Sequence, residues 1–157
     1  MLSRKIGEHK TEEACQAATT GLFLMLFTSI IFSFAGIFLS DTIAFKMAAN
    51  PELQTLCKQY LSINLVYCCG IFLQTYGQRL LQAVGDTVLS MISLIIGAIL
   101  NIILDPIMIF GLFGCPAMGI RGAAITTVIG QMVGAIAALL FNHFRNPLIS
   151  EIIWTDK

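Results

Sequence analysis

Charge is scarce in this sequence. Charged residues make up 11% of the 157 residues, while 57% are hydrophobic and the formal net charge is zero. Soluble domains typically carry about twice that charged fraction, so a water-soluble fold of this length would lack the polar side chains to cover its surface. A balanced charge also offers no basic face to nucleic acid. The composition therefore predicts an integral membrane protein with the lipid bilayer, and no nucleic acid, as a partner.

Motifs of soluble enzymes are missing as well. The five cysteines include the adjacent pair Cys68 and Cys69, but no C-x-x-C pair and no Cys/His spacing suited to zinc. We find no phosphate-binding loop and no nucleophile beside a suitable base. The chain is therefore not expected to be an enzyme or to bind a cofactor. Residues 1–14 are hydrophilic, so the first apolar run is expected to be a retained span rather than a signal peptide.

Four apolar runs are each long enough to cross a bilayer, which takes about 20 residues in a helix. They cover residues 20–45, 60–84, 88–112 and 119–141. The expected fold class is all-α and integral to the membrane, with four transmembrane helices within residues 20–141. The polar segments 1–19 and 142–157 are expected to lie outside the bilayer.

The connections between the runs carry start signals for helices. Pro51 is placed to begin a short amphipathic helix that leads into the second run. The Gly85-Asp86-Thr87 turn separates the second run from the third, and Asp86 or Thr87 is expected to cap the third helix.

The basic residues indicate how the helices are oriented. With four spans, both chain ends and the turn at 85–87 share one side of the membrane, and that side carries Arg4, Lys5, Lys10, Arg79, Arg145 and Lys157. The opposite side carries Lys46, Lys58 and Arg121. Because basic loops favour the cytoplasm, both ends are predicted to be cytoplasmic in a multi-pass protein of the cell membrane.

Asp105 is the one acid well inside an apolar run. A carboxylate near the centre of a membrane helix costs about 2.5–3.5 kcal/mol on insertion scales. Asn101 lies one helical turn before it, and Pro106, which has no N–H, leaves the carbonyl of Ile102 without its helical partner. The Asp105 carboxylate, the Asn101 amide and the Ile102 carbonyl thus place oxygen atoms within about one turn, and such a group suits a proton or a sodium ion. The alternative is that Asp105 only hydrogen-bonds to a neighbouring helix.

Polar residues also recur along the second run. Their spacings of 4, 3, 7 and 4 residues put them on one face of a helix: Tyr60, Asn64, Tyr67, Gln74 and Gln78. Contact of such a face with lipid tails would be costly, because polar groups are expensive to bury in hydrocarbon. It is expected to line a water-filled cavity or to make hydrogen bonds to another helix.

The fourth run is typical of a packing helix. Gly130-x-x-x-Gly134 allows a close approach of helix backbones, and Thr127 and Gln131 either add polar atoms to the interior or serve packing alone. In the first run, the hydroxyls of Thr28, Ser29 and Ser33 are expected to bond to their own helix.

Several segments of the chain resemble the multidrug and toxic compound extrusion (MATE) family. The most specific block contains GDT at 85–87, GAILNIILDPI at 97–107 and IFG at 109–111. GIRGAAITTVIGQ at 119–131 is similar to the sixth helix of that family, SRKIG at 3–7 to the loop after its second helix, and YLSI at 60–63 to the start of its fourth. Together these segments span nearly the whole chain.

This resemblance implies a fold and a function. Members of the family have twelve helices in two six-helix lobes around a central cavity, and they export drugs or organic cations in exchange for protons or sodium. The four runs would be the third to sixth helices of the first lobe. The resemblance implies that Asn101, Asp105 and Thr127 bind the coupling cation, that Gln78 and Tyr60 line the cavity, and that the partners are a small-molecule substrate and the remaining helices of the transporter.

The sequence also departs from that family. It starts after the second helix and lacks the second lobe, so we expect a fragment that does not transport alone, because alternating access requires two lobes. Two other functions stay open. One is a flippase of lipid-linked sugars, which the absence of Arg and Lys from the middle of the runs disfavours. The other is a small four-helix scaffold or self-assembling transporter.

Overall fold

The computed structural model describes residues 11–47 and 50–145, and within these residues it contains helices and no strand. The helices in chain order are α2 (Thr11–Met47), α3 (Pro51–Val66), α4 (Cys69–Ala83), α5 (Thr87–Phe110), the 3₁₀ turn η1 (Leu112–Gly114) and α6 (Ile120–Arg145). The predicted all-α class is confirmed. Residues 1–10 and 146–157 lie outside the described residues, and so do the predicted features located there: Arg4, Lys5, Lys10, Lys157 and the SRKIG segment.

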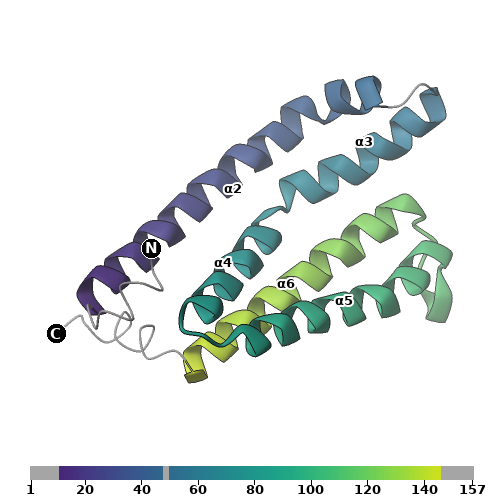
Figure 1. Ribbon diagram of the computed structural model, residues 1–157. Coiled ribbons are helices and arrows are strands. Elements are labelled where there is room, and N and C mark those ends of the chain that lie inside the picture. Colours follow the sequence, from purple (N-terminus) through teal and green to yellow (C-terminus); the bar gives the residue numbers. More distant parts are fainter. Residues whose placement is uncertain (1–10, 48–49, 146–157) are drawn as a thin grey trace.

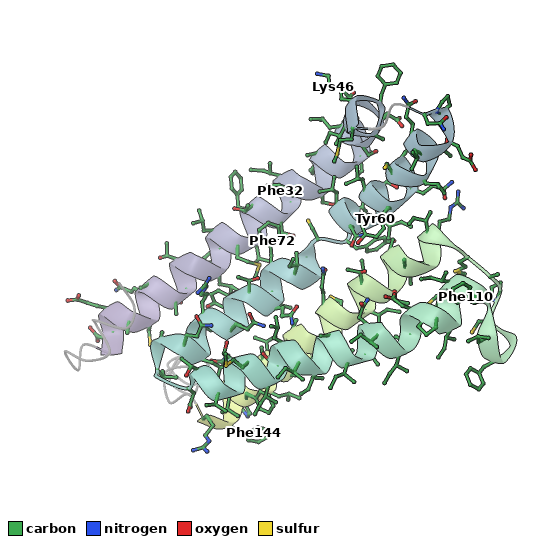
Figure 2. All side chains as sticks on the ribbon, turned by 45° about the vertical axis from the view of Figure 1, so that its right-hand side comes forward. Phe32, Lys46, Tyr60, Phe72, Phe110 and Phe144 are labelled. Carbon is green, nitrogen blue, oxygen red and sulfur yellow. The ribbon has the colours of Figure 1, made fainter. Side chains whose placement is uncertain are left out.

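The helices run up and down in one bundle (Figure 1). One end of the bundle holds the start of α2, the turn between α4 and α5, and the end of α6; the other end holds the end of α2, the start of α3 and η1. Figure 2 shows Lys46 and Phe110 at the second end and Phe144 at the first. α2, α5 and α6 are each long and apolar enough to cross a membrane, and α3 and α4 pass the same test when taken together as one bent pair. The four predicted runs correspond, among the described residues, to α2, to the pair α3 and α4, to α5 and to α6.

Large apolar side chains cover the outside of the bundle. Phe23 and Phe38 of α2 and Ile102 of α5 are exposed over more than two thirds of their surface, at 68%, 73% and 70%. The buried residues of α5 are small: Ser90, Ser93 and Gly97. This distribution is the reverse of that in a soluble protein. It fits helices whose outer faces contact lipid tails and whose inner faces pack closely.

Two helices extend beyond their predicted ends. α2 begins at Thr11 instead of residue 20, and α6 ends at Arg145 instead of residue 141. The predictions followed hydropathy, which marks only the part of a helix that suits lipid. Glu12 and Glu13 in the first turn of α2 favour a helix there, because the helix dipole stabilises negative charge at an N-terminus.

The second predicted span, at 60–84, is not one straight helix. A helix does begin at Pro51, as predicted, but it continues to Val66 as α3. α4 then starts at Cys69, and the two helices are bent by 50° at the break between them. The prediction of a single helix was wrong because the break contains no proline, so neither hydropathy nor a breaker residue marks it.

The hydroxyl groups of α2 do not all bond to their own helix. Thr28 donates to the carbonyl of Leu24 at 2.7 Å, as predicted. Ser33 instead donates to the carbonyl of Val66 in α3 at 2.9 Å, so its predicted partner was wrong. The physical reason is that the break in the neighbouring helix leaves a carbonyl without a helical partner, and this carbonyl lies within reach.

α5 spans nearly the predicted residues, Thr87 to Phe110. Asp86 occupies its N-cap position, but it makes no side-chain cap hydrogen bond because its backbone (φ −82°, ψ 59°) is not extended as a capping residue requires. The predicted capping contact was therefore wrong, and Thr87 is the first residue of the helix. Gly111 ends α5 in the left-handed conformation (φ 74°), which glycine adopts without steric cost. The helix continues through Pro106.

One ridge of α6 packs this helix against both α5 and α4. Its members are buried and recur every four residues: Gly122, Thr126, Gly130, Gly134, Ala138 and Asn142. A Cβ atom on Gly130 would lie 2.8 Å from the carbonyl oxygen of Gly97 in α5, and one on Gly77 of α4 would lie 2.9 Å from the Cβ of Ala138. The predicted close approach at Gly130-x-x-x-Gly134 is confirmed. Because each step of four residues turns about 40° around the helix, the ridge contacts α5 at its start and α4 at its end.

Candidate functional site

The carboxylate of Asp105 meets α6. Asp105 lies in the last two turns of α5 and is partly buried, and the hydroxyl of Thr126 in α6 donates a hydrogen bond to it. Thr126 is fully buried, and its oxygen also lies 2.9 Å from the carbonyl oxygen of Ala123. A hydroxyl has one proton to donate, so Thr126 has two acceptors within reach of a single donor.

A pocket of about 180 Å³ lies where α4, α5 and α6 meet. Four of its lining residues are polar: Gln74, Asn101, Thr127 and Gln131. The others are small or apolar: Leu94, Gly97, Ala98 and Gly130. None of these residues is charged, so the pocket offers amide and hydroxyl groups to whatever enters it.

Two of the three predicted cation-binding residues line this pocket together. Thr127 donates its hydroxyl proton to the carbonyl of Ala123 at 2.8 Å, which leaves the lone pairs of its oxygen available to a ligand. The side-chain nitrogen of Asn101 is buried and has no hydrogen-bond partner among the described residues. Asp105, the third, lies one turn along α5 from Asn101, and its direct partner is Thr126 rather than Thr127. Asn101 and Thr127 therefore lie at the pocket, and Asp105 lies one helical turn further along the α5–α6 interface.

The break between α3 and α4 divides the five polar residues predicted on one face of the second span. Gln74 is buried and lines the pocket, and the amide nitrogen of Gln78 is buried without a hydrogen-bond partner in the described part of the chain. Tyr60 and Asn64 belong to α3, where the Asn64 amide donates to the carbonyl of Tyr60 at 3.1 Å. Tyr67 lies in the break and is exposed. The five residues therefore belong to two helices and the break between them, not to one continuous helix.

Sequence reasoning missed Thr126. A threonine in a membrane helix often bonds to its own backbone, so residue type alone does not distinguish Thr126 from Thr127. The four-residue repeat from Gly122 to Asn142 does distinguish them, because Thr126 belongs to it and Thr127 does not. Gln131, which the sequence left open between a polar and a packing role, lines the pocket.

Helices of membrane length that surround buried polar groups define a multi-pass membrane protein with a polar site between α4, α5 and α6. The particular family follows from comparison with known proteins. The family model MatE matches residues 1–107, and the chain belongs to this family.

The curated relatives are named for multidrug resistance or multidrug export. The chain is 35% identical over 135 residues to the "Probable multidrug resistance protein NorM" of Thermotoga maritima, an alignment that covers 85% of this chain and 29% of the relative. It is 25% identical over 150 residues to the protein of the same name in Bacillus cereus, covering 96% and 33%. It is also 25% identical over 149 residues to the "Multidrug export protein MepA" of Staphylococcus haemolyticus, covering 95% and 32%. The chain thus spans about a third of the length of these relatives.

A solved structure has the same fold. It is described as an inward-facing conformation of a multidrug resistance MATE family transporter of the MOP superfamily. The TM-score is 0.82 at 23% identity, and the match covers 97% of this chain and 37% of the solved chain. The arrangement of α2 to α6 is therefore that of part of a MATE transporter.

Proposed function

We propose that this chain forms the coupling-cation part of an antiporter that exports drugs or organic cations in exchange for protons or sodium ions. Family membership and the names of the relatives support transport as the activity. The observation that carries the proposal is the contact between Asp105 and Thr126, next to a pocket lined by Asn101 and Thr127. Ionisable residues within membrane helices generally serve ion pathways or pair with a neighbouring group, and this carboxylate has both a partner and an adjacent pocket.

A proton on Asp105 would be accommodated without loss of a hydrogen bond. When Asp105 is ionised, the Thr126 hydroxyl donates to the carboxylate. When Asp105 is protonated, its O–H donates to the Thr126 oxygen, and Thr126 donates to the carbonyl of Ala123, which lies within 2.9 Å. Both states satisfy the buried hydroxyl, and an unsatisfied one would be costly. A site that carries a proton through a transport cycle must tolerate both states.

A sodium ion would be held by oxygen atoms of the same region. The carboxylate of Asp105, the side-chain oxygen of Asn101 and the hydroxyl oxygen of Thr127 are hard ligands of the kind that such cations prefer. Thr127 keeps its lone pairs available because it donates its proton to Ala123. The donor set therefore fits either coupling ion, and the ion replaces the proton that Asp105 would otherwise hold.

The exported substrate would enter the polar space beside this site. Gln74, Asn101 and Gln131 present donors and acceptors without charge, which suits the planar, hydrogen-bonding groups of many drugs, while the charge of Asp105 attracts an organic cation. We assign Tyr60, Asn64, Tyr67 and Gln78 to the wall of the wider cavity that the whole transporter encloses.

Both chain ends are proposed to face the cytoplasm. The excess of basic residues on their side supports this orientation. Cys115, which follows η1 at the opposite end and is exposed, provides the test. With the other four cysteines replaced by alanine, a maleimide that cannot cross membranes should label Cys115 from outside intact cells. Labelling of Cys115 only after the cells are opened would show the opposite orientation, with both chain ends outside the cell.

Replacement of Asp105 by asparagine tests the proposed function. In the protein that contains this chain, reconstituted in liposomes, Asp105→Asn is expected to reduce gradient-driven export of a fluorescent organic cation by about tenfold or more. Asp86→Asn, at the turn between α4 and α5, is the matched control and should export normally. Unchanged export by Asp105→Asn, with unchanged dependence on pH and sodium, would remove Asp105 from the mechanism.

The 157 residues alone are proposed not to transport, since alternating access needs two lobes that move around one site. Liposomes that contain only these residues should show no gradient-driven export, although Asp105 should still bind its cation. Export by this chain alone would instead support the self-assembling transporter.

A further inference from the structure

The break between α3 and α4 contains no proline. Sharp kinks in helices come from proline, from glycine–serine pairs, from π-bulges, or from a group that inserts into the ladder of backbone hydrogen bonds. Val66, Tyr67, Cys68 and Cys69 span the break and include neither proline nor glycine, and Gly70 follows them in α4. Without proline in the break, a contact from another helix is a physical means of holding the bend of 50°.

Ser33 of α2 supplies such a contact. In an unbroken helix the carbonyl of Val66 would accept the N–H of Gly70. Here the Gly70 N–H points to the carbonyl of Tyr67 at 3.4 Å, and the carbonyl of Val66 accepts the Ser33 hydroxyl at 2.9 Å instead. The Ser33 hydroxyl thus replaces one backbone hydrogen bond of a regular helix.

A second contact lies one turn away on the same face of α2. The thiol of Cys68 donates to the carbonyl of Ser29 at 3.4 Å. Gly36, three residues beyond Ser33, allows the end of α3 to approach, because a Cβ there would lie 3.1 Å from the backbone of Leu65. Ser29, Ser33 and Gly36 therefore form one face of α2 that contacts the residues of the break.

Beyond these contacts, the ring of Phe72 in α4 packs against Phe32 of α2. The rings of Phe32 and Phe72 lie 5.6 Å apart and tilted by 50° (Figure 2). Phe72 lies two residues before Gln74, which lines the polar pocket between α4, α5 and α6. The direction of α4 after the break thus decides where Gln74 stands relative to Asn101 and Thr127.

We propose that Ser33 is a positioning residue for export: its hydroxyl holds the break between α3 and α4, and the break places Gln74 in the substrate pocket. The inference rests on the proposed function. Without the hydroxyl, the carbonyl of Val66 has no partner in a region without water, where an unsatisfied backbone group is costly. The helix can recover that hydrogen bond only by straightening, which turns α3 away from its present direction relative to α4.

The matched variants are Ser33→Thr and Ser33→Val, which have the same shape and differ in the hydroxyl. Thr28→Ala is the control for loss of a hydroxyl from the same helix, since Thr28 bonds within α2. Spin labels at Thr55→Cys on α3 and Val88→Cys on α5, both at exposed positions, report the direction of α3. The background carries Cys68→Ser, which retains a donor at the break, and alanine at the other four cysteines.

Ser33→Val is expected to shift the distance between the labels or add a second population, whereas Ser33→Thr and Thr28→Ala keep the original distribution. In export assays, Ser33→Val should raise the apparent KM for the organic cation by roughly three- to tenfold with little change in maximal rate. Ser33→Thr should restore the original KM. Cation binding at Asp105 should be unchanged in all three.

Equal label distances in Ser33→Val and Ser33→Thr would overturn the proposal, and so would a KM that does not follow the hydroxyl. The distance measurement needs no transport. A failure of the export hypothesis, seen as normal export by Asp105→Asn, is therefore distinguishable from a failure of the role given to Ser33.

Discussion

The contact of α5 with α6 and the contact of α2 with the broken pair α3–α4 are built differently. Between α5 and α6, backbone meets backbone over successive turns, since Cβ atoms on Gly122 and Gly130 would each lie within 2.8 Å of a carbonyl oxygen of α5. Of the two α2 glycines with a neighbour in contact range, Gly36 approaches α3 closely and Gly21 makes only an ordinary contact with Tyr76. Elsewhere α2 contacts its neighbours through the ring of Phe72, through Tyr76 and through single polar groups such as Ser33.

We expect this difference to separate a rigid part, α5 with α6, from an adjustable part, α2 with α3 and α4. Closely packed backbones cannot move without loss of many contacts at once, so the Asp105–Thr126 contact has a fixed frame. A helix break held by a hydroxyl and a thiol can change its angle at the cost of a few hydrogen bonds. The cation site therefore lies in the part that keeps its shape, and the bend lies in the part that can change it.

The largest expected effect is from a methyl group added to the rigid part. Gly130→Ala places a Cβ 2.8 Å from the carbonyl of Gly97, and such overpacking typically costs about 1–3 kcal/mol. Gly21→Ala in α2 meets only an ordinary contact at 3.5 Å from Tyr76 and should be neutral or stabilising, because alanine favours a helix. Thermal unfolding in detergent compares the two. Equal melting temperatures of Gly130→Ala and Gly21→Ala would contradict tighter packing of α5 with α6 than of α2 with its neighbours.

A smaller effect is expected from the polar contacts that α6 and α2 each make with α4. Asn142 is fully buried in α6 and donates to the carbonyl of Gly77 at 2.7 Å, so Asn142→Leu should cost about 1–2 kcal/mol. Tyr76 donates to the carbonyl of Ala18 in α2 at 2.9 Å, and Tyr76→Phe should cost about 0.6 kcal/mol. Denaturation of the two variants in the same detergent gives the order. A larger loss for Tyr76→Phe would contradict it.

The smallest effect is expected at the end of α2. Lys58 and Asp41 form an ion pair at 2.5 Å, but their side chains are 51% and 67% exposed. Exposed pairs contribute less than about 1 kcal/mol and weaken with salt. A double-mutant cycle with Asp41→Asn and Lys58→Met should give a coupling energy near zero at high salt. A coupling energy of about 1–2 kcal/mol, as large as the stability loss expected for Asn142→Leu, would mean that the ends of α2 and α3 are also rigid.

Much of the rigid part could be predicted from the sequence. Four apolar runs gave the spans, Gly130-x-x-x-Gly134 gave the close approach, and Asp105 stood out because no other acid lies so far inside a run. These signals are local in sequence. Thr126 was missed because a threonine has the same local signal whether it bonds to its own helix or to a neighbour.

The adjustable part could not be predicted in the same way. The break after Val66 depends on Ser33, which is 33 residues earlier in the chain, and no periodicity links the two positions. As a result, Tyr60 and Gln78 were placed on one face of a helix that is in fact broken between them. The start of α2 at Thr11 was missed because hydropathy does not mark the part of a helix outside lipid.

The most direct test of the central claim is infrared difference spectroscopy of the carboxyl group of Asp105 in the lipid-reconstituted protein. On acidification, a protonated-carboxyl band should appear that is absent in Asp105→Asn and shifted in Thr126→Val, which keeps the shape of threonine but cannot hydrogen-bond. Sodium should suppress the band if sodium competes for the site. A spectrum that is the same in all three proteins would contradict cation binding by Asp105 and its hydrogen bond with Thr126.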